Sequence, residues 1–150
     1  MLASCAIQPD SAPKNHATTA EGLLVEKAIL WNGELDEGWN PVEMKRLLED
    51  EERFEKQGTQ YLCLKPMVVF GHRSAYVGML GIGSVAGPNA TLAGTPKSIA
   101  SYISKEYGAE FQLKKGVYLC DYKPNIRLLI EKDPQLEGAS LIIGAYVGPR

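Results

Sequence analysis

Residues 110–147 read EFQLKKGVYLCDYKPNIRLLIEKDPQLEGASLIIGAYV, and this stretch decides the fold. It contains four apolar runs, at residues 110–113, 117–122, 125–131 and 140–147, and short polar turns separate them. Short connections join antiparallel neighbours, because a parallel crossover needs a dozen or more residues. The stretch therefore predicts an antiparallel meander of four strands.

Two helices are expected before this meander, over residues 40–58 and 95–108. In each segment a capping residue is followed by proline, which suits the first helical position, and a glycine stands where the helix would end. Apolar residues recur at steps of three and four in both segments, which is typical of a helix that buries one side. These signals are Asn40, Pro41 and Gly58 for the first helix, and Thr95, Pro96 and Gly108 for the second.

Three further apolar runs have weaker signals. Residues 23–31 fit neither the helical nor the strand period cleanly and end at a turn, so we predict an edge strand. Residues 61–70, which Pro66 interrupts, and residues 74–80 predict a hairpin with His72 in its turn. The Gly-rich stretch that follows predicts a long surface loop over residues 81–94.

The expected fold is thus α+β, with two helices packed on an antiparallel sheet of about six strands. The chain has 150 residues, of which 45% are apolar and 23% are charged, which fits one domain with its own core. We assign residues 21–150 to that domain and residues 1–20 to a signal remnant and flexible tether. The tether is polar and broken by proline, so it has too little apolar area to offset the entropy of ordering.

The net charge of -2 is unevenly distributed along the chain. Residues 34–56 hold nine acidic and four basic residues, whereas residues 58–150 hold ten basic and six acidic residues. This distribution of charge provides no basic surface that could bind a phosphate backbone, so it argues against nucleic-acid binding. The acidic block predicts either a solvated helix face or a docking surface for a basic partner.

No pattern in the sequence indicates catalysis, a metal or a cofactor. His72 is the only histidine of the folded part, and neither a nucleophile elbow nor an orienting acid accompanies it, so we interpret it as a turn histidine. The glycines of residues 78–89 do not lead directly into a helix, as a phosphate-binding loop requires. We therefore expect a binding protein rather than an enzyme, with no catalytic or metal-binding residues and no cofactor.

Cys63 and Cys120 each lie inside an apolar run that resembles a strand. In an exported protein two such cysteines can pair, provided that their Cα atoms come within about 7 Å of each other. The alternative is two separate buried thiols that behave as small hydrophobic groups. Neither cysteine has the CxxC spacing or neighbouring histidine of a metal or redox site.

The sequence near the start, Leu2-Ala3-Ser4-Cys5, resembles the bacterial lipobox, in which the signal is cut before a lipidated cysteine. An export signal also needs an apolar segment of about 7 to 15 residues, and only Met1 precedes this motif. Either the true start lies upstream or the match is accidental, and the polar tether favours the first. No later stretch has about 18 consecutive apolar residues, so nothing after Cys5 is expected to span a bilayer.

Three stretches of the last third look like the immunity lipoproteins that protect against type VI secretion lipase effectors. The stretches are Gly94-Thr95-Pro96 leading into Ile99, Tyr102 and Ile103; Gly116-Val117-Tyr118; and Gly144-Ala145-Tyr146-Val147-Gly148-Pro149. The resemblance implies a periplasmic inhibitor anchored through Cys5 that binds and neutralises a secreted phospholipase toxin. The alternatives are a structural or secretion-apparatus envelope lipoprotein and a small hydrolase.

The partner-binding surface is expected on exposed acidic and loop residues, because a few anchors within one patch carry most binding energy. The candidates are Glu49, Asp50, Glu51 and Glu52 in the acidic block, and Ser84 and Asn89 in the Gly-rich stretch.

Overall fold

The computed structural model describes residues 17–32, 41–79 and 87–147, and these residues form three helices and nine strands. The helices are α1 (Ala20–Ile29), α2 (Val42–Leu48) and α3 (Pro96–Tyr107). The strands are β1 (Phe54–Gln57), β2 (Gln60–Cys63), β3 (Val68–Val69), β4 (His72–Gly78), β5 (Asn89–Ala93), β6 (Gln112–Lys114), β7 (Val117–Lys123), β8 (Ile126–Lys132) and β9 (Ala139–Tyr146).

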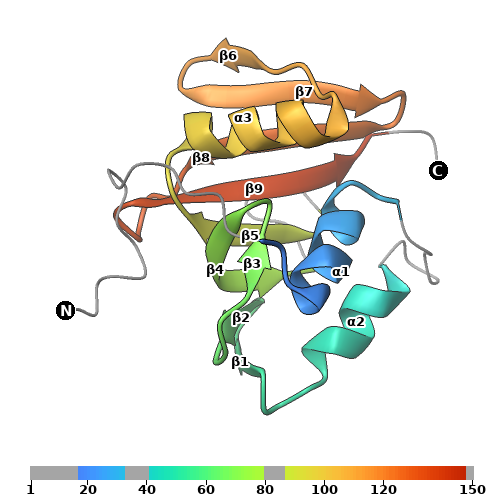
Figure 1. The fold of residues 1–150 in the computed structure, drawn as a ribbon, viewed down its shortest axis with the longest axis vertical. Coiled ribbons are helices and arrows are strands. Elements are labelled where there is room, and N and C mark those ends of the chain that lie inside the picture. Colours follow the sequence, from blue (N-terminus) through green and yellow to red (C-terminus); the bar gives the residue numbers. More distant parts are fainter. Residues whose placement is uncertain (1–16, 33–40, 80–86, 148–150) are drawn as a thin grey trace.

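All strand pairs are antiparallel and form one open sheet in the order β1-β2-β4-β5-β9-β8-β7-β6, with β3 paired to β4. Helices α1 and α3 lie on the same side of this sheet, α1 against β5 and β9 and α3 against β7 and β8 (Figure 1). The core lies between them and the sheet, where Ile29, Ile103 and Ile142 are fully buried. The α+β class is confirmed, with three helices and nine strands instead of two and about six.

The meander and the second predicted helix are confirmed. Strands β6 to β9 follow one another antiparallel in chain order, and their bounds lie within two residues of the predicted runs. Helix α3 begins as expected, because the Thr95 side chain accepts a hydrogen bond from the Ser98 backbone at 3.1 Å and Pro96 occupies the first turn. Gly108 ends the helix in the left-handed conformation, at φ 70°.

The edge strand predicted over residues 23–31 is wrong, since these residues belong to helix α1. Thr19 caps the helix by accepting a hydrogen bond from the Gly22 backbone, and the buried positions follow the helical period. The period was hidden because the charged Glu26 is buried while the apolar Leu23 is exposed. Helix α1 also places Thr19 and Ala20 in the folded part, slightly before the predicted domain start.

The helix predicted over residues 40–58 is shorter than expected. Helix α2 ends at Leu48, the chain turns, and strand β1 begins at Phe54. Gly58 therefore lies in the tight turn between β1 and β2, at φ 67°, instead of ending a helix. Helix α2 packs mainly against α1, and its end lies beside the hairpin of β1 and β2 (Figure 1).

The loop predicted over residues 81–94 contains a central strand. Strand β5 pairs with both β4 and β9, and Asn89 to Leu92 are buried. Residues 80–86 lie outside the described residues. The strand was missed because Asn-Ala-Thr-Leu-Ala contains only one β-branched residue and no aromatic one.

Helix α1 approaches the sheet at two glycines. A Cβ atom on Gly22 would lie 1.7 Å from the Val68 carbonyl oxygen, and one on Gly144 would lie 1.8 Å from the Ile29 carbonyl oxygen. Trp31, just after the helix, donates from its indole nitrogen to the Gly144 carbonyl oxygen at 2.9 Å. Both ends of α1 are therefore in backbone contact with strands.

Candidate functional site

A strained two-residue turn between β3 and β4 organises the polar groups of the interior. Phe70 and Gly71 both have positive φ, at 50° and 74°, as a type I′ hairpin turn requires. A bulky aromatic residue rarely adopts this conformation, and such strain persists only where the surroundings impose it. The Phe70 side chain is fully buried and its ring meets Tyr107 edge-on, so packing holds the turn.

The backbone of Phe70 is held by hydrogen bonds on both sides. Its N–H donates to Glu26 Oε2 at 2.8 Å, and its carbonyl oxygen accepts from His72 Nδ1 at 2.6 Å. A carbonyl oxygen can only accept, so Nδ1 carries the hydrogen. The prediction that His72 lies in the turn is wrong by one residue. His72 is the first residue of β4 and directly follows the turn.

Glu26 is a charged residue buried in the core, with only 1% of its surface exposed. Besides the Phe70 N–H, it accepts hydrogen bonds from the Thr18 hydroxyl at 2.8 Å and from the Tyr107 hydroxyl. Burial and this bond to Glu26 hold the pKa of Tyr107 well above its ordinary range. The carboxylate thus joins α1, the β3–β4 turn and the end of α3.

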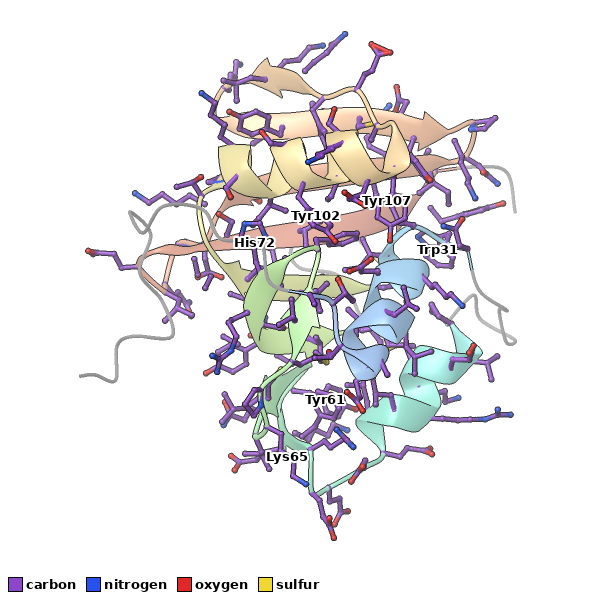
Figure 2. The ribbon with its side chains drawn as sticks, viewed as in Figure 1. Trp31, Tyr61, Lys65, His72, Tyr102 and Tyr107 are labelled. Atoms are coloured by element: carbon purple, nitrogen blue, oxygen red, sulfur yellow. The ribbon has the colours of Figure 1, made fainter. Side chains whose placement is uncertain are left out.

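His72 also contacts a serine, which no sequence pattern indicated. Ser98 Oγ, at the start of α3, forms a hydrogen bond with His72 Nε2 at 2.7 Å, although the two residues are 26 positions apart. Tyr102, one turn further along α3, places its ring edge-on to the imidazole with centroids 6.4 Å apart. Figure 2 shows His72, Tyr102 and Tyr107 together between α3 and α1.

The predicted acidic surface lies on a turn and not on a helix. Glu49 caps the end of α2, and Asp50, Glu51 and Glu52 form the turn that leads to β1. Asp50 accepts a hydrogen bond from the Glu52 backbone and forms an ion pair with Arg53 at 3.2 Å, so it holds the turn. Glu49, Glu51 and Glu52 are exposed.

An open cleft of about 510 Å³ lies beside this turn, and we call it the acidic cleft. Three glutamates and one lysine provide its charged groups, and aliphatic and aromatic side chains provide the rest. Tyr61 belongs to β2, in the hairpin of β1 and β2, and faces the end of α2 (Figure 2). The lining residues are Leu48, Glu49, Glu51, Phe54, Glu55, Lys56, Tyr61 and Leu64.

The other predicted site residues are not part of this cleft. Cys5 and Ser84 lie outside the described residues. Asn89 belongs to β5 and is 1% exposed, so its side chain is not at the surface. Its amide nitrogen donates to the Gly87 carbonyl oxygen at 3.0 Å, which orders the entry to the strand.

Cys63 and Cys120 are both free thiols. They lie on β2 and β7, which are five steps apart in the sheet order, and this corresponds to about 24 Å along the sheet. A disulfide requires Cα atoms within about 7 Å, so the bridge is not formed. The two cysteines are therefore separate thiols, of which Cys120 is buried and Cys63 is partly exposed.

Burial raises the pKa of Cys63 from its ordinary value of 9.0 to about 11, and a hydrogen bond with Ser74 opposes part of that rise. The folded state therefore keeps the thiol proton where the unfolded chain has lost it, so stability falls as the pH rises above 9. We expect this thiol to account for a loss of about 2 kcal/mol between pH 8.5 and 10.5.

Urea unfolding of the wild type and of Cys63→Ala at both pH values measures this loss. The variant should lose about 2 kcal/mol less than the wild type over that interval, because Tyr107 and Cys120 titrate in both proteins. Equal losses in the two proteins would contradict the prediction.

The longest helix among the described residues, α3, has 12 residues, so none of the described helices could span a bilayer. Comparison of the chain with protein-family models, with curated proteins and with solved structures found no match.

Proposed function

We propose that the chain is a periplasmic binding protein of the immunity type, which captures a secreted phospholipase toxin at the acidic cleft. The observation that supports this proposal is the lining of the cleft, which combines apolar side chains with charged side chains that are mainly negative. The lipobox-like Leu2-Ala3-Ser4-Cys5 supports a lipid anchor that would keep the domain at the membrane surface.

The cleft favours a basic partner segment that also carries an apolar side chain. Glu49, Glu51 and Glu55 contribute three negative charges against the single positive charge of Lys56. Complementary charges accelerate the encounter of two proteins and align them. Binding energy then comes from an anchor that fills an apolar pocket, for which Leu64, 47% exposed, and Tyr61 provide the surface.

Affinity capture with the mature domain from envelope extracts, followed by a phospholipid hydrolysis assay, tests the proposed function. The captured fraction should contain a phospholipase, and adding back the purified domain in excess should inhibit its activity. Recovery of envelope scaffold proteins without phospholipase activity would overturn the proposal and favour a structural or secretion-apparatus lipoprotein.

Charge reversal locates the binding surface. In the triple variant Glu49→Lys, Glu51→Lys and Glu55→Lys, the association rate with the captured toxin should fall at least tenfold at low salt, because the rim then repels a basic segment. A matched control reverses Glu106, Glu131 and Glu137, which are exposed and do not line the cleft.

Both triple variants change the net charge equally, so only the location of the charge differs between them. Asp50 is left unchanged because it holds the turn through Arg53 and the Glu52 backbone. Equal association rates for the two variants, measured by stopped-flow fluorescence, would exclude the acidic cleft as the docking surface.

A further inference from the structure

We propose that Ser98 is a nucleophile activated by His72, and that this pair transfers acyl groups from small carboxylic esters to water. The proposal is independent of toxin binding at the acidic cleft, because Ser98 and His72 lie at the start of α3 and β4 and do not line that cleft.

The first argument is the orientation of the imidazole. Nδ1 donates to the Phe70 carbonyl oxygen at 2.6 Å, and this bond selects the neutral tautomer in which Nε2 carries the lone pair; Nε2 lies 2.7 Å from Ser98 Oγ. In serine hydrolases an acceptor on Nδ1 fixes the tautomer in the same way and stabilises the imidazolium that forms. Here the backbone carbonyl of the strained turn takes the place of a carboxylate.

The second argument is the rigidity of the pair. Phe70 is fixed by Glu26 at its N–H and by its buried ring, so its carbonyl oxygen has a defined position. A Cβ atom on Gly94 would lie 2.7 Å from the imidazole Cδ2, so the backbone of Gly94 packs closely on the ring. Catalytic groups need this kind of support, since small displacements reduce rates strongly.

The third argument is the position of the hydroxyl at the surface. Ser98 is half-buried and follows the exposed residues Thr95 and Lys97 in the first turn of α3, whereas His72 is 8% exposed. The Lys97 N–H, in the first turn of α3, has no acceptor within the helix, and the helix N-terminus favours negative charge. The field of the helix N-terminus therefore favours negative charge near Ser98.

The chemistry that this arrangement supports is ester hydrolysis through an acyl-serine. Ser98 Oγ forms a bond to the ester carbonyl carbon while its proton moves to His72 Nε2. The bond from that carbon to the alcohol oxygen breaks, and the leaving alkoxide takes the proton from Nε2. Water then attacks the acyl-serine with His72 as the base, which releases the carboxylic acid and restores Ser98.

A fluorophosphonate probe tests the proposal, because it bonds to an activated serine hydroxyl with loss of fluoride. In the full-length protein at pH 8, peptide mapping should find the adduct on Ser98, formed at least tenfold faster than on Ser101. Ser98→Ala should abolish labelling, while Ser101→Ala, an exposed serine one turn along the same helix, should leave it unchanged. Absence of an adduct, or equal labelling of Ser98 and Ser101, would overturn the proposal.

Replacing His72 could unfold the turn, so a pair of cysteine variants supplies the second measurement. Ser98→Cys should react with N-ethylmaleimide at pH 7 at least tenfold faster than Ser101→Cys, because the imidazole would hold the thiol as a thiolate. Since position 101 is the more exposed of the two, accessibility alone predicts the opposite order. An equal or slower reaction at position 98 would contradict activation by His72.

Discussion

Gly144→Ala is expected to prevent folding or to lower the free energy of unfolding by more than about 4 kcal/mol, the range reached when a core is disrupted. The added Cβ would lie 1.8 Å from the carbonyl oxygen of Ile29, and that oxygen belongs to backbone that cannot rotate away. Strand β9 is central in the sheet, bonded to β5 and β8, so it cannot move outward without breaking two ladders. Helix α1 must therefore leave the sheet.

A substitution at a second glycine, Gly58, measures the cost of replacing a glycine where no steric clash occurs. Gly58 has positive φ, at 67°, but nothing lies within 4 Å of the position of its Cβ. Gly58→Ala should therefore cost only about 1 kcal/mol, the price of an alanine in the left-handed region. Urea unfolding followed by circular dichroism compares the two variants.

A loss of 1 kcal/mol or less in Gly144→Ala would show that the end of α1 can shift away from β9. The indole of Trp31 reports such a shift, because it donates to the Gly144 carbonyl oxygen and packs 5.8 Å from the ring of Tyr146. Its fluorescence should change in the variant wherever the protein remains folded.

The parts of the fold that the sequence predicted correctly are those with strong local signals. Helix α3 has a capping threonine, a proline in the first turn and a glycine at its end, and each acts within a few residues. The meander of β6 to β9 has short turns that leave no room for any other connection. These signals need no knowledge of distant contacts.

Helix α1 and strand β5 depend on their surroundings and were missed. Glu26 occupies a core position of α1, where its charge is accommodated only because donors from Thr18, Phe70 and Tyr107 converge on it. Strand β5 consists mainly of small and polar residues, and it is a strand because β4 and β9 pair with it on both sides. Tertiary context decided both elements.

The contacts between the polar groups of the interior could not be predicted, because the residues that form them are far apart in the sequence. Tyr107 meets Glu26 across 81 positions, and Ser98 meets His72 across 26. No motif joins these residues, and only the fold brings α3 over the β3–β4 turn. Glu49 and Glu51, which line the acidic cleft, were among the partner-binding residues expected from the sequence, but the cleft itself could not be predicted, because the hairpin of β1 and β2 provides half of its lining.

Glu26→Leu is expected to lower the free energy of unfolding by about 3 to 5 kcal/mol, as removal of one partner from a buried charged network does. The leucine fills most of the same volume but leaves the hydroxyls of Thr18 and Tyr107 and the N–H of Phe70 without their acceptor. The turn at Phe70 then loses one of the two hydrogen bonds that hold its positive φ.

Glu21→Leu is the matched control, because it makes the same chemical change on the same helix at a partly exposed ion pair. Glu21 lies 3.2 Å from Arg53, and exposed pairs of this kind contribute at most about 1 kcal/mol. Tyr107→Phe, which removes one donor and keeps the carboxylate, should cost about 1 to 3 kcal/mol.

Amide hydrogen exchange at Phe70 distinguishes loss of this clamp from a general loss of stability. In Glu26→Leu the Phe70 amide should exchange faster than amides of β8, which pairs with β7 and β9 in the meander. In Glu21→Leu all of these amides should keep their protection. A uniform change across Phe70 and β8 would mean that Glu26 stabilises the whole domain without holding the turn. The position of the Phe70 carbonyl oxygen, to which His72 donates, would then depend on the packing of the buried Phe70 ring.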